Sequence, residues 1–232
     1  MTARPRVLLD PATLTALRVP AGYVRQAVGF FAKTDEARAG LMATAGVAPT
    51  ALDAADGTMS LADELALVGA LNTRIGRHWA VEALPIWAPA SQGALDLAAR
   101  SAATIGEGLA LAAQYAPARA PQFAATFDTA TDPAALTIAL RVAVDAGVGA
   151  AMCEAATLSA VAMIASLADG PLTILAYDWP WGPPAHAEAL RQAAPGTHRF
   201  NAATCTLHVP HAIADQPSPH RDAGLLAATI AN

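Results

Sequence analysis

The sequence predicts an α+β fold, in which an N-terminal helical layer and long alanine-rich helices pack on a small, mainly antiparallel sheet. The first observation is composition: 54% of the 232 residues are hydrophobic and only 5% are aromatic. Much of this apolar content is alanine, which favours close helix packing over a bulky sheet core. The second observation is that helical patterns alternate irregularly with short strand-like segments. This order is typical of α+β rather than doubly wound folds.

The N-terminal third of the chain is expected to be helical. Residues 1–19 are interpreted as a polar leader that ends in an extended segment before Pro20. Beyond it, apolar residues at i, i+4, i+7 and i+8 begin the first helix at residue 21, and a second short helix is stopped by Gly46. Ser60 is the expected N-cap of a third helix that runs from residue 61 to about residue 75.

The middle of the chain combines a long helix with two strands. Residues 78–89 are short, apolar and flanked by proline, so a strand and a loop both remain open. The helix over 93–116 is expected to break near 101–108, because Thr104 and Glu107 have the spacing of a capping box. Two strands then follow, over residues 122–130 and 134–144. Alternating apolar residues in the second of them predict one buried and one exposed face.

The last third of the chain contains the most apolar helix and the remaining strands. Residues 148–168 form a helix that ends at Asp169-Gly170-Pro171. The segments that follow are expected as a strand over 172–177, a turn with two tryptophans, a helix over 185–194, and strands over 197–201 and 204–210. A tail over 215–232 begins with a proline-rich linker and enters a further helix.

Charge, hydropathy and cysteine usage restrict the function classes. The formal charge of −5 and the absence of a Lys/Arg cluster argue against direct binding of nucleic acid. Glu154 interrupts the most apolar segment, which predicts a buried helix and no membrane span. Cys153 and Cys205 lack CxxC spacing, which indicates reduced thiols and a cytoplasmic protein, although a single disulfide between them remains open.

No catalytic, metal or cofactor site is expected. The sequence around Ser91 lacks the first glycine of a nucleophile elbow. Cys205, His208 and His211 are three apart, but residues three apart in a strand point to opposite faces and do not form a tetrahedral metal site. Asp178, at a strand end before Pro180, is the most suggestive carboxylate, and a turn-starting role accounts for it.

Several segments, in this order, resemble the N-terminal effector domain of AraC-type transcriptional regulators, the arabinose-binding-like group. "VPAGYVRQAVGFF" is similar to the opening helix of that family, and the late unit that begins "LAYDWPWGPP" follows its strand–turn–helix–strand order. The most specific segment is "GALDLAARSAATIGEGLALAAQY", which contains the break at Ser101 and Thr104. Gln114 stands where the family commonly has arginine.

The resemblance implies a non-enzymatic ligand sensor over residues 20–214, followed from residue 215 by a linker to a helix-turn-helix DNA-binding domain. An effector would bind between the helical layer and the sheet, and a homodimer is also expected. The alanine-rich helices favour a small apolar or aromatic acid over a sugar. The expected ligand-binding residues are Trp87, Gln92, Tyr115, Arg119, Trp179 and Trp181. A dimerisation domain without a ligand site and a small enzyme of another type remain the alternatives.

Overall fold

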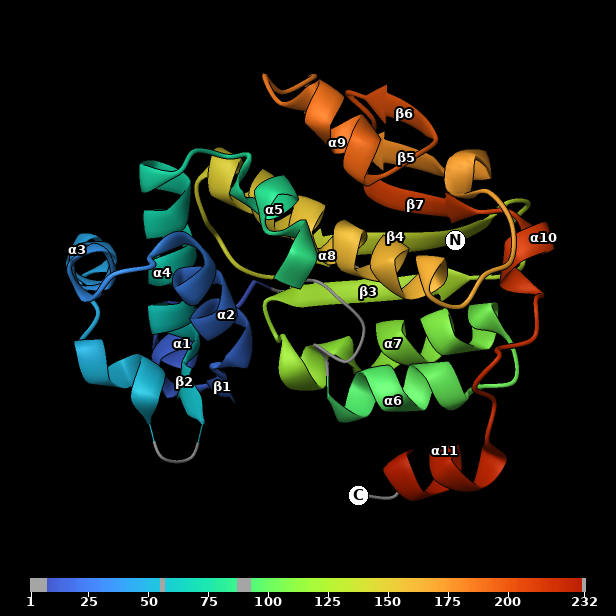
Figure 1. Cartoon of the computed structure of the whole chain (residues 1–232), viewed down its shortest axis with the longest axis horizontal. Helices are drawn as coiled ribbons and strands as arrows, with labels where there is room; N and C mark the ends of the chain where they lie inside the picture. The colour runs from blue at the N-terminus through green and yellow to red at the C-terminus, as the bar shows by residue number, and fades with distance from the viewer. Residues whose placement is uncertain (1–7, 55–56, 87–92, 231–232) are drawn as a thin grey trace.

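The computed structural model describes residues 8–54, 57–86 and 93–230. A layer of helices from the N-terminal third stands beside a five-stranded sheet that is covered by further helices (Figure 1). The α+β prediction is therefore confirmed. Helices account for most of the described residues, and the sheet is small.

The N-terminal layer is held by local caps and a two-stranded sheet. Its elements are α1 (Pro11–Ala16), β1 (Arg18–Pro20), α2 (Gly22–Phe31), α3 (Asp35–Ala45), β2 (Thr58–Ser60) and α4 (Leu61–Arg74), with a 3₁₀ turn at Pro49–Asp53. Gly46 ends α3 with a positive φ of 67°. The Ser60 side chain accepts a hydrogen bond from the Asp63 N–H at 3.0 Å. Both predicted helix boundaries are confirmed. The segment interpreted as a leader supplies α1 and β1, and β1 pairs antiparallel with β2.

The main sheet has the strand order β3-β4-β7-β5-β6. Its strands are β3 (Phe123–Asp128), β4 (Ala134–Leu140), β5 (Ala176–Trp179), β6 (Thr197–Phe200) and β7 (Cys205–Val209). Only β5 and β6 pair parallel, and the other neighbours are antiparallel. Leu136 and Ile138 on β4 are buried while their neighbours are partly exposed, which confirms the predicted alternation.

Three helices, two of them long, pack around the sheet. They are α6 (Ala94–Ser101), α7 (Ile105–Arg119) and α8 (Ala146–Ala165). Helix α7 packs beside β3 and α6 packs on α7, while α8 contacts β4, α4 and the short helix α5 (Trp79–Glu82). The predicted break between α6 and α7 is confirmed, because Thr104 caps α7 and the Glu107 carboxylate accepts from the Ala103 N–H. Helix α8 has the length and hydropathy of a membrane span, but 72% of its most apolar window is buried within the fold, which makes it a core helix.

Two sequence predictions about local structure are wrong. Residues 79–86 form α5 and a 3₁₀ turn at Leu84–Ile86, and are neither a strand nor a loop. Trp79 and Ala80 are buried against the rest of the fold, and Pro85 cannot donate a hydrogen bond to a neighbouring strand. Residues 172–174 form a 3₁₀ turn instead of a strand. The strand begins only at Ala176, where β6 and β7 supply pairing partners.

The C-terminal segments complete the fold. They are α9 (Ala187–Ala193), α10 (His211–Ala214) and α11 (Ala223–Ile230). Helix α9 lies beside the β5–β6 edge, and α11 packs on the outer side of α6 at the periphery of the molecule (Figure 1). No residue of α11 is buried.

The close crossing of α6 and α7 yields a prediction about stability. A methyl group at Gly108 would collide with the carbonyl oxygen of Ala99. We expect Gly108→Ala to lower the free energy of unfolding by about 1–3 kcal/mol, because overpacked backbone must move. Gly69→Ala in α4 is the control, since nothing lies within 4 Å of the new methyl group. It should raise stability by about 0.5–1 kcal/mol. Urea denaturation of both variants measures this, and equal midpoints would contradict the steric argument.

Candidate functional site

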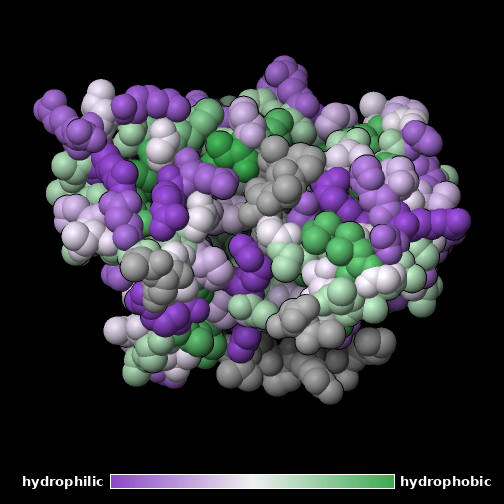
Figure 2. All heavy atoms as spheres, turned by 60° about the horizontal axis from the view of Figure 1, so that its bottom comes forward, coloured by the Kyte–Doolittle hydropathy of each residue, from purple (hydrophilic) through white to green (hydrophobic). Residues whose placement is uncertain are grey.

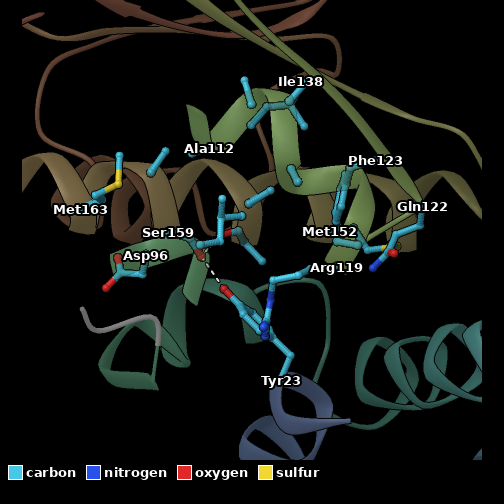
Figure 3. Close-up of a pocket in the computed structure, with 18 of the residues that line it drawn as sticks. Tyr23, Asp96, Ala112, Arg119, Gln122, Phe123, Ile138, Met152, Ser159 and Met163 are labelled. Carbon is cyan, nitrogen blue, oxygen red and sulfur yellow. Dashed lines mark hydrogen bonds between the residues drawn. The ribbon is translucent and has the colours of Figure 1, made fainter. Parts of the chain in front are cut away.

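A cavity of about 220 Å³ lies where the N-terminal layer, the long helices and the sheet meet. Its walls come from α2, α4, α6, α7, α8, β3 and β4 (Figure 3). Many of the lining residues on α7 and α8 are alanines, whose short side chains leave the space between these helices open. The larger apolar lining residues are Val68, Trp79, Leu95, Leu109, Phe123, Leu136, Ile138, Met152 and Met163. This location agrees with the expected place for an effector, between the helical layer and the sheet.

Glu64 and Gln122 bring polar atoms to one end of the cavity. Glu64 lies in the first turn of α4 and is 9% exposed, and Gln122 lies between α7 and β3 and is 5% exposed. Burial raises the pKa of Glu64 from its ordinary value of 4.5 to about 7, and a hydrogen bond from the Gln122 side chain opposes that rise. Glu64 Oε2 and Gln122 Oε1 are buried without a hydrogen-bond partner among the described residues.

Asp96 and Arg100 form a second polar pair, on α6. Arg100 Nε donates to Asp96 Oδ2 at 2.8 Å, and both side chains are largely buried. Within the described part of the chain, Arg100 Nη2 is buried without a hydrogen-bond partner. Figure 3 shows Asp96 and Gln122 on opposite sides of the cavity. The cavity is therefore mostly apolar, with one polar pair on each of these two sides.

Tyr23 connects the N-terminal layer to α8 across the cavity. Its hydroxyl lies 2.8 Å from Ser159 Oγ (Figure 3). Because Ser159 Oγ donates to the Ala155 carbonyl oxygen at 3.0 Å, the Tyr23 hydroxyl is the donor in this bond. Pairing of the two hydroxyls holds α2 against α8 while both residues line the cavity.

The structure brings one of the residues expected from the sequence into the cavity. Arg119, the last residue of α7, lines it. Tyr115 is 36% exposed on α7 and is not among the lining residues. Trp87 and Gln92 lie outside the described residues. The ligand-binding roles assigned to these side chains remain predictions.

The two tryptophans of the late turn lie elsewhere. Trp179 is completely buried and packs against Trp181, with ring centroids 5.5 Å apart. Its Nε1 donates to His198 Nδ1 at 3.0 Å. Trp181 lines a different cavity, together with residues of β4 and α8, and the Arg77 guanidinium lies 4.9 Å from its ring centroid. The tryptophan pair therefore packs a corner of the core.

Sequence reasoning missed the polar residues that face the cavity. Glu64 lies in the first turn of α4, where a carboxylate usually interacts with the helix dipole, yet it lies three residues after Leu61 and three before Leu67 on the buried side of that helix. A carboxylate within an apolar stripe is the signal that could have identified it. No comparable sequence signal marks Gln122, Asp96 and Arg100, because only the tertiary fold turns these side chains toward the cavity.

Asp178 lacks the features of a general acid or base. Burial alone would raise its pKa, but hydrogen bonds from Arg199 and His208 outweigh this effect, and the pKa is lowered. Arg199 contacts both carboxylate oxygens, at 2.6 and 2.8 Å, and His208 Nε2 lies 2.8 Å from Oδ2. The described residues contain no group of three side chains arranged to hold a metal ion.

Comparison with known proteins agrees with this architecture. Residues 37–218 match the family described as the arabinose-binding domain of AraC transcription regulators, N-terminal. The fold is similar to the crystal structure of the transcriptional regulator CdpR from Pseudomonas aeruginosa, with a TM-score of 0.61 and 15% sequence identity. The alignment covers 83% of this chain and 59% of that regulator. A search of curated proteins gave no significant match.

The raised pKa of Glu64 predicts a pH-dependent stability. Between pH 4.5 and about 7 the folded state holds a proton that the unfolded state has lost, so the free energy of unfolding falls as pH rises. The total loss is about 3 kcal/mol. Glu64→Gln should remove this slope and become more stable than the parent protein above neutral pH.

Denaturant titrations at several pH values measure this slope. Asp63→Asn is the matched control, because it removes a partly exposed carboxylate from the same helical turn and should leave the slope in place. Parallel pH profiles for the parent protein and Glu64→Gln would contradict the assignment.

Proposed function

This chain belongs to the family of arabinose-binding N-terminal domains of AraC transcription regulators, and we propose that it senses a small-molecule effector in the cavity between α4, α6, α7, α8 and the sheet. The observation that carries this proposal is a mostly apolar cavity in which Glu64 Oε2, Gln122 Oε1 and Arg100 Nη2 have no hydrogen-bond partner among the described residues. Ligand sites typically combine an apolar wall with a few placed polar groups. In a domain without a ligand site, we would expect side chains to fill the space that this cavity occupies.

Effector binding would act on DNA through a domain outside this chain, in the cytoplasm. Helix α6 lines the cavity with Asp96 and Arg100 and contacts α11 on its outer side. The Ser218 hydroxyl donates to the Arg100 carbonyl oxygen, and the Asp222 N–H donates to the Ser101 carbonyl oxygen at 3.0 Å. A shift of α6 would thus move the segment that leads into α11. An effector biases such a shift only by binding one arrangement more tightly than the other.

Homodimerisation through α6 and α11 is a second role that a specific observation favours. Leu97 on α6 and Leu225 and Ile230 on α11 are large hydrophobic side chains left exposed. Hydrophobic side chains gather among hydrophilic ones on the face that carries these helices (Figure 2). Exposed apolar patches of this kind mark interaction sites.

Filling the cavity tests the proposed effector site. Ala156 on α8 lines the cavity, and we expect Ala156→Phe to abolish thermal stabilisation by any compound that binds there. A compound at about 100 times its dissociation constant should add roughly 2.7 kcal/mol to the parent protein. Ala165→Phe, at an exposed position of the same helix, is the control and should respond like the parent. Equal responses of both variants, or no response of the parent to a broad panel of small apolar compounds, would refute the site.

Sedimentation velocity tests the dimer. The double variant Leu225→Asp, Ile230→Asp places charges on the exposed apolar face of α11 and should sediment as a monomer where the parent sediments as a dimer. Leu8→Asp removes another exposed apolar side chain, far along the chain, and should leave the dimer intact. A monomeric parent protein at all accessible concentrations would rule out this role.

A further inference from the structure

Resting on the proposed function, we infer that the effector is an apolar amine whose protonated nitrogen binds between Glu64 Oε2 and Gln122 Oε1. Both oxygens are buried, both belong to lining residues of the cavity, and neither has a partner among the described residues. They come from side chains that hydrogen-bond each other, so they lie at the same end of the cavity. Buried polar atoms are rarely left unpaired, and this pair accepts rather than donates.

The orientation of Gln122 follows from its effect on Glu64. The hydrogen bond between the two side chains lowers the pKa of Glu64, which means that the Gln122 amide N–H₂ donates to the carboxylate. The amide oxygen is then not bonded to Glu64 and remains as a second acceptor. An ammonium group has three N–H donors and can satisfy both oxygens at once, whereas a hydroxyl has one.

The charge of the Glu64 end also favours a cation. Arg100 is already paired with Asp96 at the other end of the cavity. The shift in the Glu64 pKa is caused by burial and by Gln122, with no contribution from a cationic side chain. A buried carboxylate is stabilised chiefly by a hydrogen-bonded opposite charge, and a ligand ammonium would provide it.

The remaining cavity sets the body of the ligand. Beyond Glu64 and Gln122 the walls are formed mostly by alanines and larger apolar side chains such as Leu109, Phe123 and Met152. The other polar lining residues are Tyr23, Asp96, Arg100, Arg119 and Ser159. An apolar cavity of about 150 Å³ holds benzene. The 220 Å³ available here therefore suits a body of about the size of an aromatic ring with a short alkyl arm. 2-Phenylethylamine is a suitable probe of that class.

Titration of Glu64 gives the binding a characteristic pH dependence. The other ionisable lining side chains are Tyr23 on α2, Asp96 and Arg100 on α6, and Arg119 on α7; α8, β3 and β4 contribute none. As pH rises through about 7, Glu64 loses its proton while the amine keeps its own. Affinity for the amine should therefore rise about tenfold between pH 6 and pH 8.

Isothermal titration calorimetry of the whole chain tests the inference with three matched probes: 2-phenylethylamine, 2-phenylethanol and 3-phenylpropionate. We expect the amine to bind most tightly at pH 8. Glu64→Gln should weaken amine binding at pH 8 at least tenfold and abolish its pH dependence. Gln122→Met should weaken binding but keep the pH dependence. Asp63→Asn should change neither, and the thermal unfolding of each variant verifies that it is folded.

The outcomes separate this inference from the proposed function. Preferential binding of 3-phenylpropionate, or of the alcohol, that Ala156→Phe abolishes would overturn the amine assignment and leave the cavity as the effector site. Amine binding that Ala156→Phe leaves unchanged would overturn the inference as well, because the amine would be bound outside the cavity. Failure of all three probes to bind would count against the cavity itself, and so against both.

Discussion

The fold depends on a carboxylate that is completely buried in the middle of α8. Glu154 is 0% exposed, and its two oxygens contact Arg77 at 2.7 Å and His186 at 2.9 Å. Arg77 follows α4, and His186 is the first residue before α9, so one charge fixes α8 to the N-terminal layer and to the C-terminal edge of the sheet. Because an unpaired buried charge costs several kcal/mol, these elements are held in one arrangement. The Arg77 guanidinium also covers Trp181.

Glu154 holds α8 in place on one side of the helix, and other residues of α8 line the cavity. Helices approach closely where a side chain is missing: Gly108 packs on Ala99, and Gly106 packs on Ala214. Between α7 and α8, by contrast, facing alanines are too short to meet, and the gap stays open. Alanine therefore has two consequences in this chain. It allows tight helix pairs where the backbones are pulled together, and it leaves a void where α8 is held in place by Glu154.

Local signals predicted the fold better than the site. Ser60, Thr104 and Gly46 act through hydrogen bonds and dihedral angles of their own neighbourhood, so their helix boundaries can be derived from sequence. The structure of residues 79–86 depends on burial of Trp79 against distant elements, and pattern reasoning failed there. The same difference between local and long-range interactions explains why the site was predicted less well than the helix boundaries. Trp179 and Trp181 do share a contact, but the burial of Trp179 and the cavity that Trp181 lines depend on how distant elements dock, which no local pattern encodes.

The polar ends of the cavity belong to different layers of the fold, and this suits a sensor. Glu64 lies on α4 of the N-terminal layer, while Arg100 lies on α6, whose C-terminal end is hydrogen-bonded to Ser218. Each end has a buried atom without a hydrogen-bond partner among the described residues, which disfavours this arrangement relative to any that exposes these atoms to water. A molecule that satisfies these atoms stabilises this arrangement selectively. Under the proposed function, differential affinity of this kind is the physical requirement for transmitting a signal from the cavity to the segment beyond α6.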